Sequence, residues 1–135
     1  MKIFIILFSM LLTSPTNATS LYLDLKSHHF NPKPYYVENH DLIGIEHNGW
    51  LLVRYSNSEG HPSVILGRRS VWGQLGIISY GAKYGLVSGY TGDLNVIGDY
   101  APFVMLNSAI DFGIIAIDIN LIPGAVITAG WRFDF

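Results

Sequence analysis

Apolar and polar residues alternate with a period of two along much of the chain. The C-terminal segment shows this most clearly, with one apolar face formed by Ala125, Ile127, Ala129, Trp131, Phe133 and Phe135. A period of two is typical of β-strands whose two faces meet different surroundings. Such segments are rich in Ile, Val, Leu, Tyr and Phe, and Gly, Pro and Asn separate them. They predict eight strands, near residues 20–30, 42–47, 50–56, 62–70, 75–88, 102–110, 113–121 and 125–135.

The connections between these segments alternate between tight turns and longer loops. Asn48-Gly49 is the strongest hairpin signal, because both residues of such a turn take a positive φ. Further tight turns are expected at 111–113 and 123–124, and longer loops at 31–41, 57–61 and 91–101. Short turns at one end and longer loops at the other are typical of outer-membrane barrels. No segment shows helical periodicity with caps.

The N-terminal segment has the pattern of a secretory signal peptide. Lys2 is followed by an apolar stretch over 3–12 and a polar run that ends at Ala18. The apolar stretch is shorter than the roughly 20 residues that a membrane-spanning helix needs. We therefore expect residues 1–18 to be removed and residues 19–135 to form a single β-barrel domain outside the cytoplasm.

Composition narrows the class of protein further. Of 135 residues, 50% are hydrophobic and only 13% are charged, and the formal net charge is −2. This excludes a disordered chain and gives no basic face for nucleic acid. The absence of cysteine excludes disulfides and thiol chemistry, and the histidine spacing gives no metal site, so we expect no cofactor.

The export signal and the C-terminal residues Trp131–Phe135 favour a membrane barrel over a soluble one. A terminal Phe behind alternating aromatic residues resembles the C-terminal signature of bacterial outer-membrane barrels. The predicted fold is therefore all-β, an eight-stranded antiparallel up-and-down transmembrane β-barrel in the outer membrane of a Gram-negative bacterium. Only a closed barrel satisfies every strand edge in lipid.

Several segments, taken in order, resemble the lipid A palmitoyltransferase family of outer-membrane barrels. These segments are Ser27–Phe30, Val37–Gly44, Tyr55–Ser58, Pro62–Gly67, Pro102–Leu106, Asn120–Gly124 and Gly130–Phe135. The C-terminal third matches best. The family's N-terminal amphipathic helix has no counterpart, because Thr19–Leu21 leaves no room for it.

The resemblance implies an enzyme that moves an acyl chain from a phospholipid to lipid A, as a monomer without a cofactor. Carried across, it implies His29 and Ser58 as catalytic residues, with Asn57 where the family has Asp. It places Gly67 at the floor of the acyl pocket and Pro123 beside a lateral gap that admits lipid. Asn cannot carry the charge that stabilises an imidazolium, although it can orient a group by hydrogen bonds.

Two positions on the first strand compete for the catalytic role. Simple alternation places Lys26 and His28 in the lumen and turns His29 towards lipid, whereas the resemblance selects His29. A β-bulge or an early strand end would reconcile the two. We further expect lumen charges that pair with one another, at Asp24, Lys26, Asp118, Arg132 and Asp134, and an interfacial aromatic girdle at Trp72, Tyr80, Tyr84, Tyr90 and Trp131.

Two other functions remain open from the sequence. A non-enzymatic barrel could use its outer loops to bind or mask a surface partner, and a bacteriophage-encoded barrel that modifies the host surface would fit this alternative. A soluble periplasmic lipid-binding barrel is the third possibility, which the aromatic C-terminus disfavours.

Overall fold

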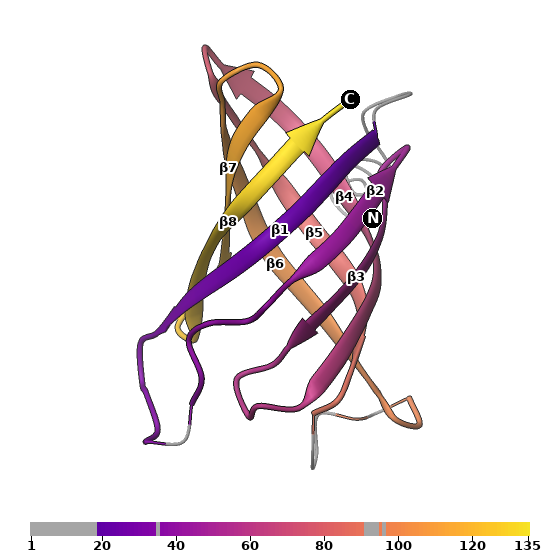
Figure 1. The fold of residues 1–135 in the computed structure, drawn as a ribbon, viewed down its shortest axis with the longest axis vertical. Helices are drawn as coiled ribbons and strands as arrows, with labels where there is room; N and C mark the ends of the chain where they lie inside the picture. The colour runs from indigo at the N-terminus through magenta and orange to yellow at the C-terminus, as the bar shows by residue number, and fades with distance from the viewer. Residues whose placement is uncertain (1–18, 35, 91–94, 96) are drawn as a thin grey trace, which may run out of the picture.

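The computed structural model describes residues 19–34, 36–90, 95 and 97–135, and the predicted signal peptide lies outside this part of the chain. The described residues form a closed barrel of eight antiparallel strands in the order β1 to β8 (Figure 1). The strands are β1 (Thr19–His29), β2 (Ile43–His47), β3 (Trp50–Ser56), β4 (Pro62–Leu75), β5 (Ile78–Ser88), β6 (Tyr100–Asp111), β7 (Ile115–Ile122) and β8 (Val126–Asp134). No helix in the described residues is long and apolar enough to cross a membrane.

Both ends of the described chain lie at the end of the barrel that carries the tight turns, at the top of Figure 1. Asn48 and Gly49 take φ values of 51° and 82°, as the predicted hairpin requires. The longer connections leave β1, β3 and β5 at the opposite end, which we call the mouth. The predicted separation of short turns from long loops therefore holds for the turns after β2, β4 and β6, whereas the short turn at 123–124, after β7, lies at the mouth.

The connection between β4 and β5 differs from its prediction. We expected one strand to end at residue 70 and the next to begin at 75, but β4 continues to Leu75 and turns at Gly76 and Ile77. The register shifts between Val71 and Gly73, so that the alternation of apolar residues is interrupted there. That interruption had the appearance of a loop in the sequence.

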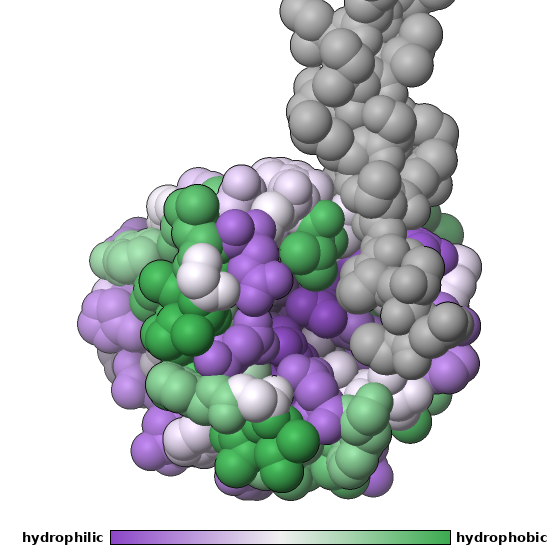
Figure 2. Space-filling view, turned by 90° about the horizontal axis from the view of Figure 1, so that it is seen from above, coloured by the Kyte–Doolittle hydropathy of each residue, from purple (hydrophilic) through white to green (hydrophobic). Residues whose placement is uncertain are grey.

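Apolar side chains cover the outside of the barrel and polar ones fill much of its lumen. The outward residues of β7, which include Ile115, Ile117 and Ile119, are more exposed than the inward Ala116, Asp118 and Asn120. Viewed from the end with the tight turns, hydrophilic side chains gather in the centre (Figure 2). This distribution is the inverse of a soluble barrel and is that of a barrel whose strands cross a membrane.

A β-bulge in β1 decides which histidine faces the lumen. Asp24 has a φ of 55°, and the register against β8 shifts between Leu23 and Leu25. The extra residue reverses the alternation, so that His29 is buried while Lys26 and His28 are exposed. The prediction from simple alternation, which placed Lys26 and His28 in the lumen, is therefore wrong.

The lumen nearer the tight turns is closed by paired charges, which we call the polar floor. The Arg69 guanidinium makes two hydrogen bonds to the Glu46 carboxylate, of 2.7 and 2.9 Å, and Tyr22 donates a third of 2.7 Å. Lys83 pairs with Asp118 and Arg132 pairs with Asp111 and Asp134. The predicted pairing of lumen charges with one another is confirmed for Arg132 and Asp134, whereas Asp118 pairs with Lys83, and Asp24 and Lys26 are exposed.

Candidate functional site

The mouth brings together two residues that lie far apart in the sequence. His29 ends β1, and Ser58 lies in the short loop after β3. The distance from His29 Nε2 to Ser58 Oγ is 2.9 Å, within hydrogen-bonding range. Tyr36 packs on the His29 ring with a centroid separation of 4.5 Å. The two residues selected from the sequence as a catalytic pair thus lie in direct contact.

Backbone contacts hold Ser58 beside His29. The carbonyl of Ser58 accepts a hydrogen bond of 2.9 Å from the Val37 amide, which ties the first loop to the second. Phe30 donates its amide to the carbonyl of Ala125 and thereby anchors the end of β1 against β8. The pair is consequently fixed by three separate segments of the chain.

Asn57 lies next to Ser58 but its side chain organises the loop. The amide nitrogen donates to Ser63 Oγ at 2.9 Å and to the carbonyl of Gly89 at 2.8 Å. Its oxygen accepts from the amides of Glu59 and His61, at 2.9 and 3.0 Å. Because these four bonds occupy the buried amide, Asn57 acts on the site through the loop that positions Ser58.

His29 Nδ1 is buried and has no hydrogen-bond partner within the described residues. A catalytic histidine is normally oriented by a group at its second nitrogen, most often a carboxylate. Neither Asn57 nor a carboxylate fills that place here. The ring is oriented instead by packing against Tyr36 and by the contact with Ser58.

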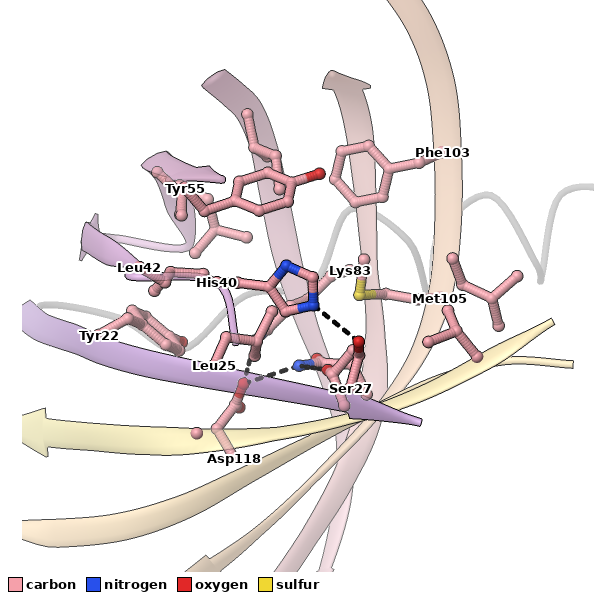
Figure 3. A pocket seen from close by; sticks show the side chains of 18 of the residues that line it. Tyr22, Leu25, Ser27, His40, Leu42, Tyr55, Lys83, Phe103, Met105 and Asp118 are labelled. Carbon is pink, nitrogen blue, oxygen red and sulfur yellow. Dashed lines mark hydrogen bonds and ion pairs between the residues drawn. The ribbon is translucent and has the colours of Figure 1, made fainter. Parts of the chain in front are cut away.

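An apolar cavity runs from this pair into the half of the lumen nearer the mouth. A space of about 470 Å³ at the mouth is lined by both His29 and Ser58. It continues into a narrower cavity of about 120 Å³ that shares Tyr55, Ile65, Phe103 and Met105 with it (Figure 3). The inner cavity ends against the Lys83–Asp118 pair of the polar floor. Its mainly apolar lining suits a hydrocarbon chain.

Gly67 faces the lumen between Ile65 and Arg69, at the boundary between the apolar cavity and the polar floor. A Cβ atom at Gly67 would lie 2.5 Å from the carbonyl oxygen of Tyr84 and 3.3 Å from the ring of Phe103. Glycine therefore allows β4 and β5 to approach closely and leaves the Phe103 ring its place. Its predicted role as the floor of an acyl pocket stays a prediction.

The wall beside Pro123 is incompletely paired. Within the described residues, β6 pairs with β7 only from Leu106 and Leu121 onwards, so its mouth-side part, residues 100–105, pairs with β5 and not with β7. Pro123 follows the last residue of β7, at the edge of this opening. Val104, Ile122 and Ala125 line the outer cavity there. The gap in pairing between β6 and β7 therefore lies beside the outer cavity.

Two tyrosines lie where the outer cavity joins the inner one. Tyr55 and Tyr90 hydroxyls lie 3.1 Å apart. Burial raises the pKa of the Tyr90 phenol above its ordinary value, which keeps it neutral. The expectation that Tyr90 belongs to the outer aromatic girdle is wrong, although Trp72, Tyr80 and Trp131 are exposed on the outside as predicted.

The sequence analysis overlooked His40 as a site residue. His40 faces inward and is more deeply buried than His29. The described residues hold no group of three or more His, Asp or Glu side chains arranged to bind a metal.

No protein-family model matches the chain, and no curated protein matches it significantly.

Proposed function

We propose that this barrel lies in the outer membrane of a Gram-negative bacterium and transfers a fatty acyl chain from a phospholipid to lipid A or a related surface lipid. The observation that carries the proposal is the His29–Ser58 contact of 2.9 Å at the entrance of an apolar cavity. Acyl transfer needs a base beside a hydroxyl and an apolar space for the chain. The sequence resemblance to lipid A palmitoyltransferases gives the same function.

Each part of the site has a role in this proposal. His29 is the base, because a neutral imidazole accepts a proton near neutral pH. It acts on the hydroxyl of Ser58, or on an acceptor hydroxyl that binds beside it. The acyl chain occupies the cavity down to the level of Gly67, and lipid enters past Pro123 through the opening between β6 and β7.

The direct test is the lipid A of a Gram-negative host that lacks its own palmitoyltransferase and expresses the full chain. Mass spectrometry should show a gain of one acyl chain, which disappears in Ser58→Ala and in His29→Ala. Ser108→Ala is the matched control, because Ser108 lies on β6 with its hydroxyl bonded to the Ser79 carbonyl, away from the mouth. Unchanged lipid A around a folded, heat-modifiable barrel would contradict the proposal.

Two features favour a second candidate, a barrel that binds a lipid without chemical turnover. His29 Nδ1 has no hydrogen-bond partner within the described residues, and the Asn57 amide is bonded to Ser63 and Gly89 rather than to His29. In that case the cavity holds an acyl chain and the mouth presents a headgroup to a surface partner. The two functions differ in one observable. A binding protein would copurify with intact lipid and leave lipid A unaltered.

A further inference from the structure

A second serine–histidine pair, Ser27 and His40, lies deeper in the lumen than the first. His40 lies in the segment that passes between β1 and β3. Its amide donates to the carbonyl of Leu25 at 2.9 Å, and its carbonyl accepts from the amide of Ser56 at 3.0 Å. These two bonds fix the backbone of His40 from both sides. Its side chain is 3% exposed and lines the inner cavity.

The hydrogen bonds of the His40 ring determine which nitrogen carries the proton. Nδ1 lies 2.6 Å from the carbonyl oxygen of Ser56, and a carbonyl oxygen can only accept. The neutral ring therefore carries its proton on Nδ1. Nε2, at 2.7 Å from Ser27 Oγ, is left with a lone pair and accepts the hydroxyl proton of Ser27 (Figure 3). This is the arrangement of an activated nucleophile, its base and a group that orients the base.

The two pairs differ in how completely they are organised. In the outer pair the second histidine nitrogen has no partner among the residues that the structure describes, whereas in the inner pair it is held by a backbone carbonyl. Ser27 and His40 both line the apolar cavity, so a bound ester can reach them. Thr128 lies directly across from Ser27 on β8 and also lines the cavity. Its hydroxyl oxygen accepts from Asn120, so its own proton can be donated towards an oxyanion at Ser27.

We propose that Ser27 is a nucleophile, with His40 as its base, and that it carries the acyl chain as an ester. Ser27 Oγ forms a bond to the carbonyl carbon of a lipid ester while its proton moves to His40 Nε2. The bond to the leaving alcohol then breaks, and the alcohol takes that proton and departs as a lysolipid. An acceptor hydroxyl or water attacks the acyl-serine, gives its proton to His40, and Ser27 recovers it.

This inference rests on the proposed function only for the identity of the ester, a membrane lipid whose chain fills the cavity. The outer pair then has a separate task, because His29 lies two residues along β1 on the same face as Ser27. His29 and Ser58 receive the acceptor hydroxyl at the mouth. Ser27 and His40 take the acyl chain from the donor.

A fluorophosphonate probe tests the nucleophile without any need for lipid A. The full chain is folded in detergent micelles, incubated with the probe and analysed by intact mass and peptide mapping. One adduct is expected, on Ser27, absent in Ser27→Ala and formed at least about tenfold more slowly in His40→Gln. His28→Gln is the matched control, because His28 is exposed on the outside of the same strand.

Labelling of Ser58 instead of Ser27 would overturn this inference and leave the proposed function standing. A folded wild-type barrel that takes no label, or a labelling rate that His40→Gln does not change, would overturn it as well. Label on Ser27 together with unaltered lipid A in the expression host would keep the nucleophile and remove the proposed acceptor.

A cysteine variant provides a second readout, which does not depend on the loss of activity. The natural chain has no cysteine, so Ser27→Cys introduces a single thiol. A thiol beside an imidazole ionises more readily and reacts faster. Alkylation of folded Ser27→Cys by iodoacetamide at neutral pH should slow at least about tenfold on adding His40→Gln, and should not change on adding His28→Gln. Equal rates in the two double variants would contradict the pairing.

Discussion

The two halves of the lumen differ in what fills them, paired charges in one half and an apolar cavity in the other. Towards the tight turns, every strong charge has a partner: Glu46 with Arg69, and Lys83 with Asp118, make a closed polar floor. Towards the mouth, the lumen is apolar and hollow, and His29 keeps one nitrogen without a partner. A barrel of eight strands has an interior that side chains just fill. A cavity in only one half therefore shows which half is free to take a ligand.

Side chains of the polar floor and side chains at the mouth should also differ in how much they contribute to the free energy of unfolding. In the floor, each charge is stabilised only by its partner, so removal of one side chain leaves the other buried and unpaired. At the mouth, the His29–Ser58 hydrogen bond is part-buried and joins an imidazole to a hydroxyl, so its loss should cost less than the loss of one partner of a buried ion pair. Substitutions in the polar floor should consequently destabilise the barrel, whereas substitutions of the His29–Ser58 pair should remove activity from a folded barrel.

The largest effect is expected from Glu46→Ala. Glu46 is fully buried and accepts three hydrogen bonds, from Tyr22 and Arg69. Its loss leaves the Arg69 guanidinium unpaired in the lumen and should lower the free energy of unfolding by about 3–5 kcal/mol. Urea unfolding in detergent micelles, followed by tryptophan fluorescence, measures this. The double variant Glu46→Leu with Arg69→Met should recover most of the loss, and a double variant no more stable than Glu46→Ala would contradict the explanation.

A smaller effect is expected from Asn57→Asp, which replaces the buried amide by a carboxylate. A carboxylate can still accept from the Glu59 and His61 amides, but it cannot donate to Ser63 or to the Gly89 carbonyl. The substitution should therefore cost about 2 kcal/mol. The loss should shrink as pH falls, because a protonated carboxyl can donate one of the two missing bonds. An Asp variant that is as stable as the natural chain at neutral pH would show that the loop does not depend on these donations.

The smallest effect on stability is expected from Ser58→Ala. This removes one part-buried hydrogen bond, to His29, and leaves the backbone contact with Val37 intact. The free energy of unfolding should change by no more than about 1 kcal/mol, while acyl transfer is lost. A loss of several kcal/mol in the same urea titration would mean that the pair at the mouth is structural.

The sequence predicts most of the architecture because alternation, turn chemistry and strand length are local properties. The Asn48-Gly49 hairpin and the inward Asp118 and Arg132 follow directly from it. The bulge at Asp24 does not, since nothing in the residue type marks a register shift. One extra residue reverses the facing of every later position in β1, and so exchanges His28 for His29.

The candidate site is predicted only in part for a similar reason. His29 and Ser58 were found through short segments that resemble a family, and their contact in the folded chain is the geometry that such a role needs. The Ser27–His40 pair joins a strand to a loop through contacts that no spacing reveals. The role of the Ser56 carbonyl in fixing the His40 ring depends on the backbone alone, and any residue at that position would supply it.

The most direct test of the account is whether the half of the lumen nearer the mouth holds one hydrocarbon chain. Native mass spectrometry of the folded barrel with palmitate should show a single bound molecule. Ile65→Trp, which fills the shared part of the cavity, should abolish binding, and the neighbouring Leu66→Trp, on the exposed outer face, should not. Equal binding by the two variants, or no binding by the natural chain, would contradict an acyl pocket in this barrel.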